Sequence, residues 1–457
     1  MIWSNLDSVY FIGAGGIGMS ALARYFLSQG KHVAGYDRVS TPLTDQLSRE
    51  GIDLHFEDRS VLIPEMFRNP ERTLVIYTPA VPEKHQQLNY FRKRGFRVIK
   101  RSVALGEVFN FGKGIGVAGT HGKTSISSML AHVLHNSTLG CNAFLGGISK
   151  NTGSNFYLDP ASRVIIAEAD EYDRSFLTLF PEMAVVSSMD ADHLDIYHSE
   201  ANVKKGFESY IAQIKEKGKL IIKQGLAPAI PDHVERYTYA VGDSSADYHV
   251  KGMVPHGIGT RFMVVTPDMV IPGIGLEVPG LLNVENALAA VAVAHQLGVA
   301  PETIARNLSG YRGVERRFDV RVHKRTRVYI DDYAHHPEEI RAFLSAVRVL
   351  FPGQKVTGIF QPHLYSRSRD FAEGFARSLE MLDVLVLMEI YPAREEPIPG
   401  ITSRVIFDLV NLKEKYLVTR EQVMKVIAEQ DPALLVTMGA GDIYQFVPPI
   451  EGWMEKH

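Results

Sequence analysis

Cysteine is almost absent from this chain of 457 residues, in which Cys141 is the one cysteine. The chain therefore cannot form an intrachain disulfide or a cluster of thiolate metal ligands. Such sparse cysteine is typical of reducing compartments, so we expect a cytoplasmic protein. No apolar run approaches the roughly 18 residues of a membrane-spanning helix, so we expect no membrane insertion. The first seven residues lack the basic, apolar and small-residue order of a signal peptide, so we expect no secretory leader.

A large excess of charge of either sign is also missing. The formal net charge is −3, and charged residues make up 22% of the chain. This balance argues against a nucleic-acid partner, which requires a basic surface, and against a disordered acidic tail. We find no internal repeat and no low-complexity segment. A hydrophobic content of 45% is typical of a globular protein. The length of 457 residues predicts about three domains.

Short apolar runs alternate with helical patterns along most of the chain. Residues 9–12 are typical of a strand, and residues 16–29 of a helix with Met19, Leu22 and Phe26 on one face. This alternation predicts parallel sheets covered by helices. Further strands are expected at residues 31–37, 74–77, 96–99, 115–118, 164–167, 183–186, 328–330, 356–360, 384–387 and 434–437, and further helices at residues 125–135, at 284–297 and after Pro337.

Two segments interrupt this rhythm. Residues 110–114 are expected to be a linker, and residues 236–280 to form a small antiparallel β part because Gly and Pro punctuate them. We therefore predict three α/β domains. The first, residues 1–109, and the third, residues 317–457, are expected to be Rossmann-like. The central domain, residues 110–316, is expected to combine a parallel sheet of the P-loop ATPase type with the small antiparallel part.

Residues 119–124, with the sequence Gly-Thr-His-Gly-Lys-Thr, follow an expected strand and open an expected helix. Glycines let a backbone approach a phosphate, Lys123 can reach the β- and γ-phosphates of a nucleotide, and the Thr124 hydroxyl can ligate Mg²⁺. Val117 occupies the position of the first glycine of a strict P-loop, so the loop is shortened, with Gly116 and Gly119 nearby. The alternative is a glycine-rich turn with a surface lysine, but the order strand, loop, helix favours a phosphate loop.

Acidic and histidine residues follow two later strands. Glu168 ends the expected strand at 164–167, where a carboxylate would lie beside the phosphate loop and could hold Mg²⁺. A solvated acidic turn is the alternative. His193 lies in a polar loop after the strand at 183–186, where it could ligate a second metal ion, orient a water, or be only a structural histidine.

A second glycine-rich loop lies near the start of the chain. Gly13, Gly15 and Gly18 follow a strand, and Asp37 comes nineteen residues after Gly18, a spacing that matches the dinucleotide fingerprint. An NAD-dependent oxidoreductase is therefore one alternative, but a UDP-sugar also carries a diphosphate, and a simple dehydrogenase has no use for a second phosphate loop. A P-loop motor is another alternative, which the net charge and Val117 oppose.

Several motifs occur together in a fixed order, and this ordered set resembles the Mur ligases, the ATP-dependent amide ligases of peptidoglycan precursor synthesis. The resemblance covers essentially the whole chain. The motifs are Gly119-Thr120-His121-Gly122-Lys123-Thr124, Glu168-Ala169-Asp170-Glu171, Asp192-His193-Leu194-Asp195, Asn283-Val284-Glu285-Asn286, Gly313-Val314-Glu315-Arg316-Arg317-Phe318, Asp331-Asp332-Tyr333-Ala334-His335-His336-Pro337 and Phe360-Gln361-Pro362-His363.

Within the family, residues 11–20, 331–337 and 394–400 resemble the member that adds the first amino acid. The resemblance implies that ATP activates the carboxylate of UDP-N-acetylmuramate as an acyl-phosphate, which the amine of L-alanine attacks, with release of ADP and phosphate. It also implies Mg²⁺ as the cofactor. A relative that adds a preformed peptide in cell-wall recycling is the nearest alternative. The oligomeric state stays open between a monomer and a weak dimer.

The resemblance also implies roles for particular residues. The catalytic candidates are Lys123, His193, His335 and Arg367, and the base for the amine is His193 or His335. Thr78 is either a uridine contact or part of a turn, and Arg101 is either a sugar-nucleotide contact or a surface residue. The ATP candidates are Gly119, Thr120, His121, Gly122, Lys123, Thr124, Ser125, Asn283, Asn286, Arg317 and Asp332; the metal candidates are Thr124, Glu168 and His193; the UDP-sugar candidates are Gly13, Gly15, Gly16, Gly18, Met19, Asp37, Thr78 and Arg101; and the candidates for the muramoyl and amino-acid substrates are Tyr333, His335, His363 and Arg367.

Three positions depart from the family pattern. Leu282 replaces a histidine that usually precedes Asn283, and Leu364 replaces an arginine that usually follows His363. Recognition of the substrate carboxylate is then expected to depend on Arg367. Glu208 occupies the position of a carbamylated lysine found in several relatives, so we expect no carbamylated lysine here.

Overall fold

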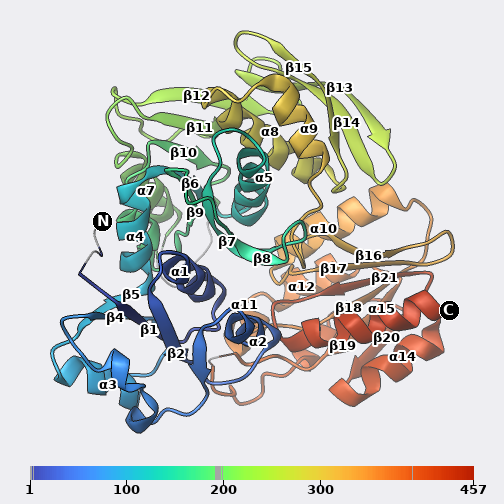
Figure 1. Ribbon diagram of the computed structural model, residues 1–457. Helices are drawn as coiled ribbons and strands as arrows, with labels where there is room; N and C mark the ends of the chain where they lie inside the picture. Colours follow the sequence, from blue (N-terminus) through green and yellow to red (C-terminus); the bar gives the residue numbers. More distant parts are fainter. Residues whose placement is uncertain (1–2, 4, 191–196, 198, 394) are drawn as a thin grey trace. The chain divides into compact units, whose positions relative to one another are not determined.

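The computed structural model describes residues 3, 5–190, 197, 199–393 and 395–457 (Figure 1). By compactness the chain divides into two units, Met1–Glu277 with Leu282–Arg312, and Val278–Leu281 with Gly313–His457. Three sheets run through the two units, and most of their strand pairs are parallel. The predicted three-domain α/β fold is thereby confirmed. No helix in the described part of the chain is long and apolar enough to cross a membrane.

The first sheet has five parallel strands in the order β3-β2-β1-β4-β5. Its order places β1, the most buried strand, in the centre, so the loop after β1 opens at the middle of the sheet's carboxyl edge. Thr41 caps α2 and Pro42 occupies its first turn. The elements are β1 (Ser8–Ile12), α1 (Ile17–Ser28), β2 (His32–Tyr36), α2 (Pro42–Arg49), β3 (Asp53–His55), β4 (Thr73–Tyr77), α3 (Gln86–Lys93), β5 (Arg97–Lys100) and α4 (Arg101–Phe111).

The second sheet has ten strands in the order β15-β14-β13-β12-β11-β10-β6-β9-β7-β8. Its central strands are parallel, while β14, β15 and β8 run antiparallel to their neighbours. The elements are β6 (Lys113–Ala118), α5 (Lys123–His135), β7 (Asn142–Ser149), β8 (Ser154–Tyr157), β9 (Val164–Ala169), β10 (Met183–Val186), α7 (Glu200–Ile211), β11 (Lys219–Lys223), β12 (Glu235–Ala240), β13 (Tyr248–His256), β14 (Gly259–Val265), β15 (Val270–Leu276), α8 (Leu281–Gln296) and α9 (Pro301–Ser309).

Two predictions about this region were wrong: the length of the antiparallel part and the presence of a linker. The antiparallel part is smaller than residues 236–280, because β12 pairs parallel with β11 and buries Tyr239. Residues 110–114 are not a linker, because α4 ends at Phe111 and β6 begins at Lys113. The glycines there serve close packing: a Cβ on Gly112 would lie 2.6 Å from the backbone oxygen of Arg163, and a Cβ on Gly114 would lie 2.4 Å from the ring of Phe109.

Helix α1 lies beside the β7–β8 hairpin (Figure 1). Arg24 of α1 is buried, and its guanidinium donates to Glu50 (Nε to Oε2, 2.7 Å) and to the side-chain oxygen of Asn155 in β8. Asn155 Nδ2 donates in turn to the backbone oxygen of Ile17. The ring of Tyr25 packs on Phe144 and Phe156 of the hairpin, with centroids 5.6 and 6.3 Å away. One hydrophobic core therefore continues from the first sheet into the second.

The third sheet has six strands in the order β16-β17-β21-β18-β19-β20, and only the β16–β17 pair is antiparallel. Alternate residues of β17 enter two different cores, Ile330 on one face and Tyr329 on the other, so helices cover both faces. Pro337 opens α10, as predicted. The elements are β16 (Asp319–His323), β17 (Val328–Asp332), α10 (Pro337–Leu350), β18 (Val356–Phe360), α11 (Tyr365–Asp370), α12 (Ala372–Leu379), β19 (Val384–Met388), α13 (Arg404–Phe407), β20 (Glu414–Val418), α14 (Val423–Gln430), β21 (Leu434–Met438) and α15 (Val447–Lys456).

Candidate active site

The predicted phosphate loop connects β6 to α5 at the centre of the ten-stranded sheet. Gly119 (φ 139°) and Gly122 (φ 84°) adopt conformations that favour glycine. A Cβ on Gly119 would lie 2.1 Å from Ser187 Oγ, so only glycine fits there. No side chain in the described part of the chain caps the N-terminus of α5. Its free backbone N–H groups and its positive dipole end therefore suit an anion.

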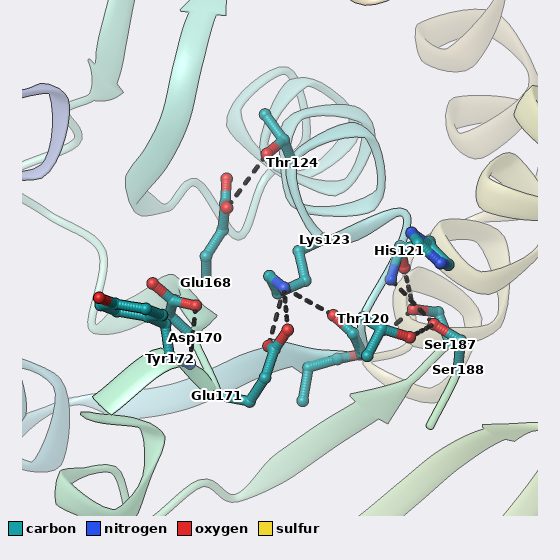
Figure 2. A network of polar contacts seen from close by, with 12 residues as sticks. Thr120, His121, Lys123, Thr124, Glu168, Asp170, Glu171, Tyr172, Ser187 and Ser188 are labelled. Carbon is teal, nitrogen blue, oxygen red and sulfur yellow. Dashed lines mark hydrogen bonds and ion pairs between the residues drawn. The ribbon is translucent and has the colours of Figure 1, made fainter. Parts of the chain in front are cut away.

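Two serines after β10, Ser187 and Ser188, lie beside the loop and bind it (Figure 2). Ser188 Oγ accepts the backbone N–H of His121 at 2.9 Å and lies 2.8 Å from Thr120 Oγ1. Ser187 Oγ donates to the backbone oxygen of His121. The His121 ring is half exposed beside Asp190. We did not single out these serines from the sequence, although two hydroxyl residues directly after a buried strand are a usable signal.

Lys123 points from the first turn of α5 toward Glu171 (Figure 2). Its Nζ lies 2.7 and 2.9 Å from the two Glu171 carboxylate oxygens and 2.7 Å from the backbone oxygen of Gly119. The side chain of Glu171 is only 2% exposed. Burial alone would lower the pKa of Lys123, but Glu171 and Asp170 raise that pKa above its ordinary value, so the ammonium stays charged.

Glu168 is the last residue but one of β9 and faces Thr124 (Figure 2). Its carboxylate accepts the Thr124 hydroxyl at 3.1 Å, the Ser127 hydroxyl at 3.2 Å and the backbone N–H of Gly146 at 2.5 Å. Hydroxyl and carboxylate oxygens are the ligands that Mg²⁺ prefers, and one or two carboxylates suffice when phosphate oxygens complete the set. Thr124 and Glu168 therefore fit a magnesium ion. No group of three or more His, Cys, Asp or Glu side chains suitable for a metal occurs among the described residues, and His193 lies outside them.

Other predicted ATP residues flank the loop. Ser125 follows Thr124 in α5 and is partly exposed. Asn286 of α8 is adjacent, since a Cβ on Gly122 would lie 2.7 Å from Asn286 Oδ1. Asn283 is one turn earlier on α8, and Leu282, which replaces the family histidine, is 57% exposed. Gly116 belongs to β6, where a Cβ would lie 2.0 Å from the Tyr210 hydroxyl, so this glycine serves packing instead of the loop.

The N-terminal glycine loop lies at the carboxyl edge of the first sheet. Asp37 supports it, because Oδ2 accepts the Gly15 N–H at 2.7 Å and Oδ1 accepts the N–H of Arg38 at 2.7 Å. A Cβ on Gly13 would lie 2.4 Å from Thr78 Cγ2, and a Cβ on Gly18 would lie 2.7 Å from Arg101 Nη1.

The structure thus brings the glycine loop together with Asp37, Thr78 and Arg101, three of the predicted sugar-nucleotide residues. Gly16 is the N-cap of α1, without a side-chain cap in the described part of the chain. Met19 does not join this group, since its side chain is in the core and its N–H donates to the Gly16 oxygen at 2.9 Å.

A second cluster gathers the predicted substrate residues at the carboxyl edge of the six-stranded sheet. The Tyr333 and His335 rings lie 5.1 Å apart, and the His335 and His363 rings lie 5.9 Å apart. The Arg317 guanidinium lies 5.2 Å from the centre of the Tyr333 ring. Burial lowers the pKa of His335, and the charges of Arg367 and Arg317 lower it further against the opposing effect of Glu339. The His335 imidazole is therefore neutral near pH 7.

Asp332 ends β17, and its carboxylate is used within the fold. Oδ2 accepts the Phe318 N–H and Oδ1 the Ala334 N–H, both at 2.7 Å. Burial raises the pKa of Asp332 to about 6, although Arg317 and these bonds oppose the shift. Asp332 thereby ties β17 to the turn at Phe318, which has a positive φ of 45°.

Family models match three consecutive segments of the chain. The Mur ligase family catalytic domain matches residues 8–112, the Mur ligase middle domain residues 117–294, and the Mur ligase glutamate ligase domain residues 316–441. The UDP-N-acetylmuramate–L-alanine ligase of Parabacteroides distasonis is 48% identical over 450 residues, which is 98% of this chain and 97% of that protein. The ligase of the same name from Phocaeicola vulgatus is 47% identical and covers 99% of both chains.

Solved structures agree with these matches. The UDP-N-acetylmuramate-alanine ligase of Thermotoga maritima superposes with a TM-score of 0.82 at 27% identity, covering 98% of this chain and 100% of that one. A murein peptide ligase of Psychrobacter arcticus superposes with a TM-score of 0.70 at 22% identity, covering 98% and 99% of the two chains, which shows a shared fold.

Proposed function

The chain belongs to the Mur ligase family, and we propose that it joins L-alanine to the carboxylate of UDP-N-acetylmuramate at the expense of ATP. The products are the amide, ADP and phosphate. The single observation that carries this proposal is the 48% identity to a curated ligase of this name over 98% of the chain. It is supported by Lys123 at the start of α5 and by the neighbouring oxygen atoms of Thr124 and Glu168.

The first step requires two anions to meet. The muramoyl carboxylate attacks the γ-phosphate of ATP, so positive charge must be concentrated at the phosphates. Lys123 supplies one cation, and the N-terminus of α5 supplies backbone N–H groups. When bound, Mg²⁺ adds charge at the phosphate oxygens, and Thr124 and Glu168 would hold it. Asn283 and Asn286 are assigned to the adenine, and Arg317 and Asp332 to further nucleotide contacts.

In the second step the amine of L-alanine attacks the acyl-phosphate, and phosphate leaves. The amine must lose a proton, which a neutral imidazole can accept. The lowered pKa of His335 supports this residue as the base. We assign the substrate carboxylate to Arg367 and the muramoyl contacts to Tyr333 and His363.

The glycine loop after β1 is assigned to the diphosphate of the UDP-sugar, with Thr78 and Arg101 beside it. The Asp37 carboxylate acts on the loop itself. We further propose that the three domains comprise residues 1–109, 110–316 and 317–457, and that the enzyme works in the cytoplasm as a monomer or weak dimer. The presence of a single cysteine, Cys141, fits a reducing compartment.

ADP release tests the proposal. The protein is mixed with Mg²⁺-ATP and UDP-N-acetylmuramate, with and without each amino acid. Release that depends on both the sugar nucleotide and L-alanine is expected. Release that requires a peptide in place of L-alanine would identify a recycling ligase, and release independent of the sugar nucleotide would refute the substrate assignment.

A further inference from the structure

Helix α11, which carries Arg367, begins in an unfavourable backbone conformation. Its N-cap is Leu364, whose φ of 72° places an L-residue in the left-handed region, at a cost of roughly 1–2 kcal/mol. The Leu364 side chain cannot accept a hydrogen bond from the first turn, as Ser or Asp would. The start of this short helix must therefore be held by other parts of the chain.

Glu395, 29 residues later, provides that support. One of its carboxylate oxygens accepts the Ser366 backbone N–H at 3.0 Å, and the other accepts the Ser366 hydroxyl. Hydrogen bonds to a carboxylate are about twice as strong as neutral ones, and a negative charge is favourable at a helix N-terminus. The two backbones also pair nearby, because Leu364 N donates to Tyr391 O at 3.0 Å and Tyr391 N to Pro362 O at 2.8 Å. Glu395 thus acts as a distant cap for α11.

Arg367 follows Ser366 directly in this helix. Its Nη1 atom is buried and has no hydrogen-bond partner among the residues that the structure describes. The guanidinium lies close enough to His335 for its charge to lower the pKa of that histidine. A buried guanidinium nitrogen with unused hydrogens suits a carboxylate, and the direction in which it points depends on the first turn of α11.

We propose that Glu395 is a positioning residue for the amino-acid substrate: through Ser366 it fixes the first turn of α11 and so orients Arg367 toward the carboxylate of L-alanine. The inference rests on the proposed function, which assigns that carboxylate to Arg367. Because Glu395 binds Ser366 in the helix that carries Arg367, we expect its removal to act on the amino acid through Arg367.

The test compares the Michaelis constants for the three substrates in four variants. In Glu395→Ala the KM for L-alanine should rise about tenfold, the loss expected for one charged hydrogen bond, while kcat and the KM for ATP and for UDP-N-acetylmuramate change less than about threefold. Glu395→Gln should recover most of the loss, because its amide oxygen still accepts from Ser366. Ser366→Ala, which keeps the backbone N–H, should give an intermediate rise. Glu429→Ala, at an exposed carboxylate of α14 outside every motif, is the control and should behave like the parent.

A double-mutant cycle separates positioning from general structural support. Adding Glu395→Ala to Arg367→Ala should raise the KM for L-alanine no further, since both changes remove the same interaction. An unchanged KM in Glu395→Ala, an equal rise for all three substrates, or full additivity would overturn the proposal. If Glu395→Ala fails to fold, the intermediate rise in Ser366→Ala decides. A parent without alanine-dependent ADP release would instead refute the proposed function.

Discussion

Replacing Lys123 by methionine should lower both the stability of the protein and its activity, for two different reasons. The ammonium of Lys123 pairs with Glu171 in the fold, and we assign it to the phosphates of ATP in the reaction. The ammonium neutralises Glu171, whose side chain is almost fully buried. Lys123→Met removes the ammonium that faces this buried carboxylate, and breaking a buried ion pair typically costs about 3–5 kcal/mol. Glu171 can avoid the penalty by taking up a proton. Relative to the ordinary pKa of 4.5 for a glutamate, keeping Glu171 protonated at pH 7 costs about 3.4 kcal/mol, at 1.36 kcal/mol per pH unit.

The expected loss of unfolding free energy at pH 7 is therefore about 3–4 kcal/mol. The sign of the pH dependence follows, because protonation becomes easier in acid: at pH 5.5 the same cost is only about 1.4 kcal/mol. The double variant Lys123→Met/Glu171→Gln contains neither charge and should regain most of this stability. Urea unfolding at both pH values measures the difference.

Activity should not recover in the double variant. Both variants lack the cation at the phosphates, so ADP release should fall at least about 10²–10³-fold. Binding of UDP-N-acetylmuramate, measured by calorimetry, should persist, because the first sheet is unchanged. Recovery of turnover in the double variant would refute the role of Lys123 at the phosphates, and a parent-like stability of Lys123→Met at pH 7 would refute the role of the ion pair.

Three further predictions use other parts of the structure. Glu168→Gln should raise the Mg²⁺ concentration that gives half-maximal ADP release about tenfold or more, and an unchanged requirement would exclude Glu168 as a ligand. Burial raises the pKa of Asp332 to about 6, from its ordinary value of 3.8, so the folded state gains about 3 kcal/mol of stability from this residue as the pH falls from 7 to below 4. The difference in unfolding free energy between Asp332→Asn and the parent, measured by urea unfolding, should therefore change by this amount over the same pH range. A difference that stays constant with pH would contradict the raised pKa. Lys217 is exposed with φ 62°, so Lys217→Gly should stabilise the protein by about 0.5–1 kcal/mol in thermal unfolding, whereas Lys215→Gly, at a neighbouring position without a positive φ, should not.

Features that depend on consecutive residues were predictable from the sequence. The order of strand, glycine loop and helix located the phosphate loop, and α5 begins at Lys123, two residues before the predicted start. The C-terminal strands at 356–360, 384–387 and 434–437 were found because runs of buried apolar residues mark parallel strands. Composition was a poorer guide around Gly112 and Gly114. The glycines there predicted a linker, but in the structure they allow close packing against Arg163 and Phe109.

Contacts between distant residues could not be predicted. Lys123 and Glu171 are 48 positions apart, and Ser366 and Glu395 are 29 apart, so no periodicity connects them. The acidic run at 168–173 indicated a site without showing which carboxylate faces the lysine and which faces the threonine. Asp37 matched a fingerprint, but a spacing cannot show that its carboxylate binds the backbone of the loop.

The buried contact between α1 and the β7–β8 hairpin determines which segments can be exchanged between related proteins in a hybrid. Family models place a boundary between residues 112 and 117, which invites the construction of chimeras at that point. A chimera that replaces only the first segment would keep Phe144, Asn155 and Phe156 and lose Arg24 and Tyr25, their partners in α1. The hairpin would then pack against a helix whose side chains need not complement it, and a mismatch at this buried contact would destabilise the hybrid. Functional hybrids should therefore be found among those in which the hairpin is inherited together with the sugar-nucleotide segment.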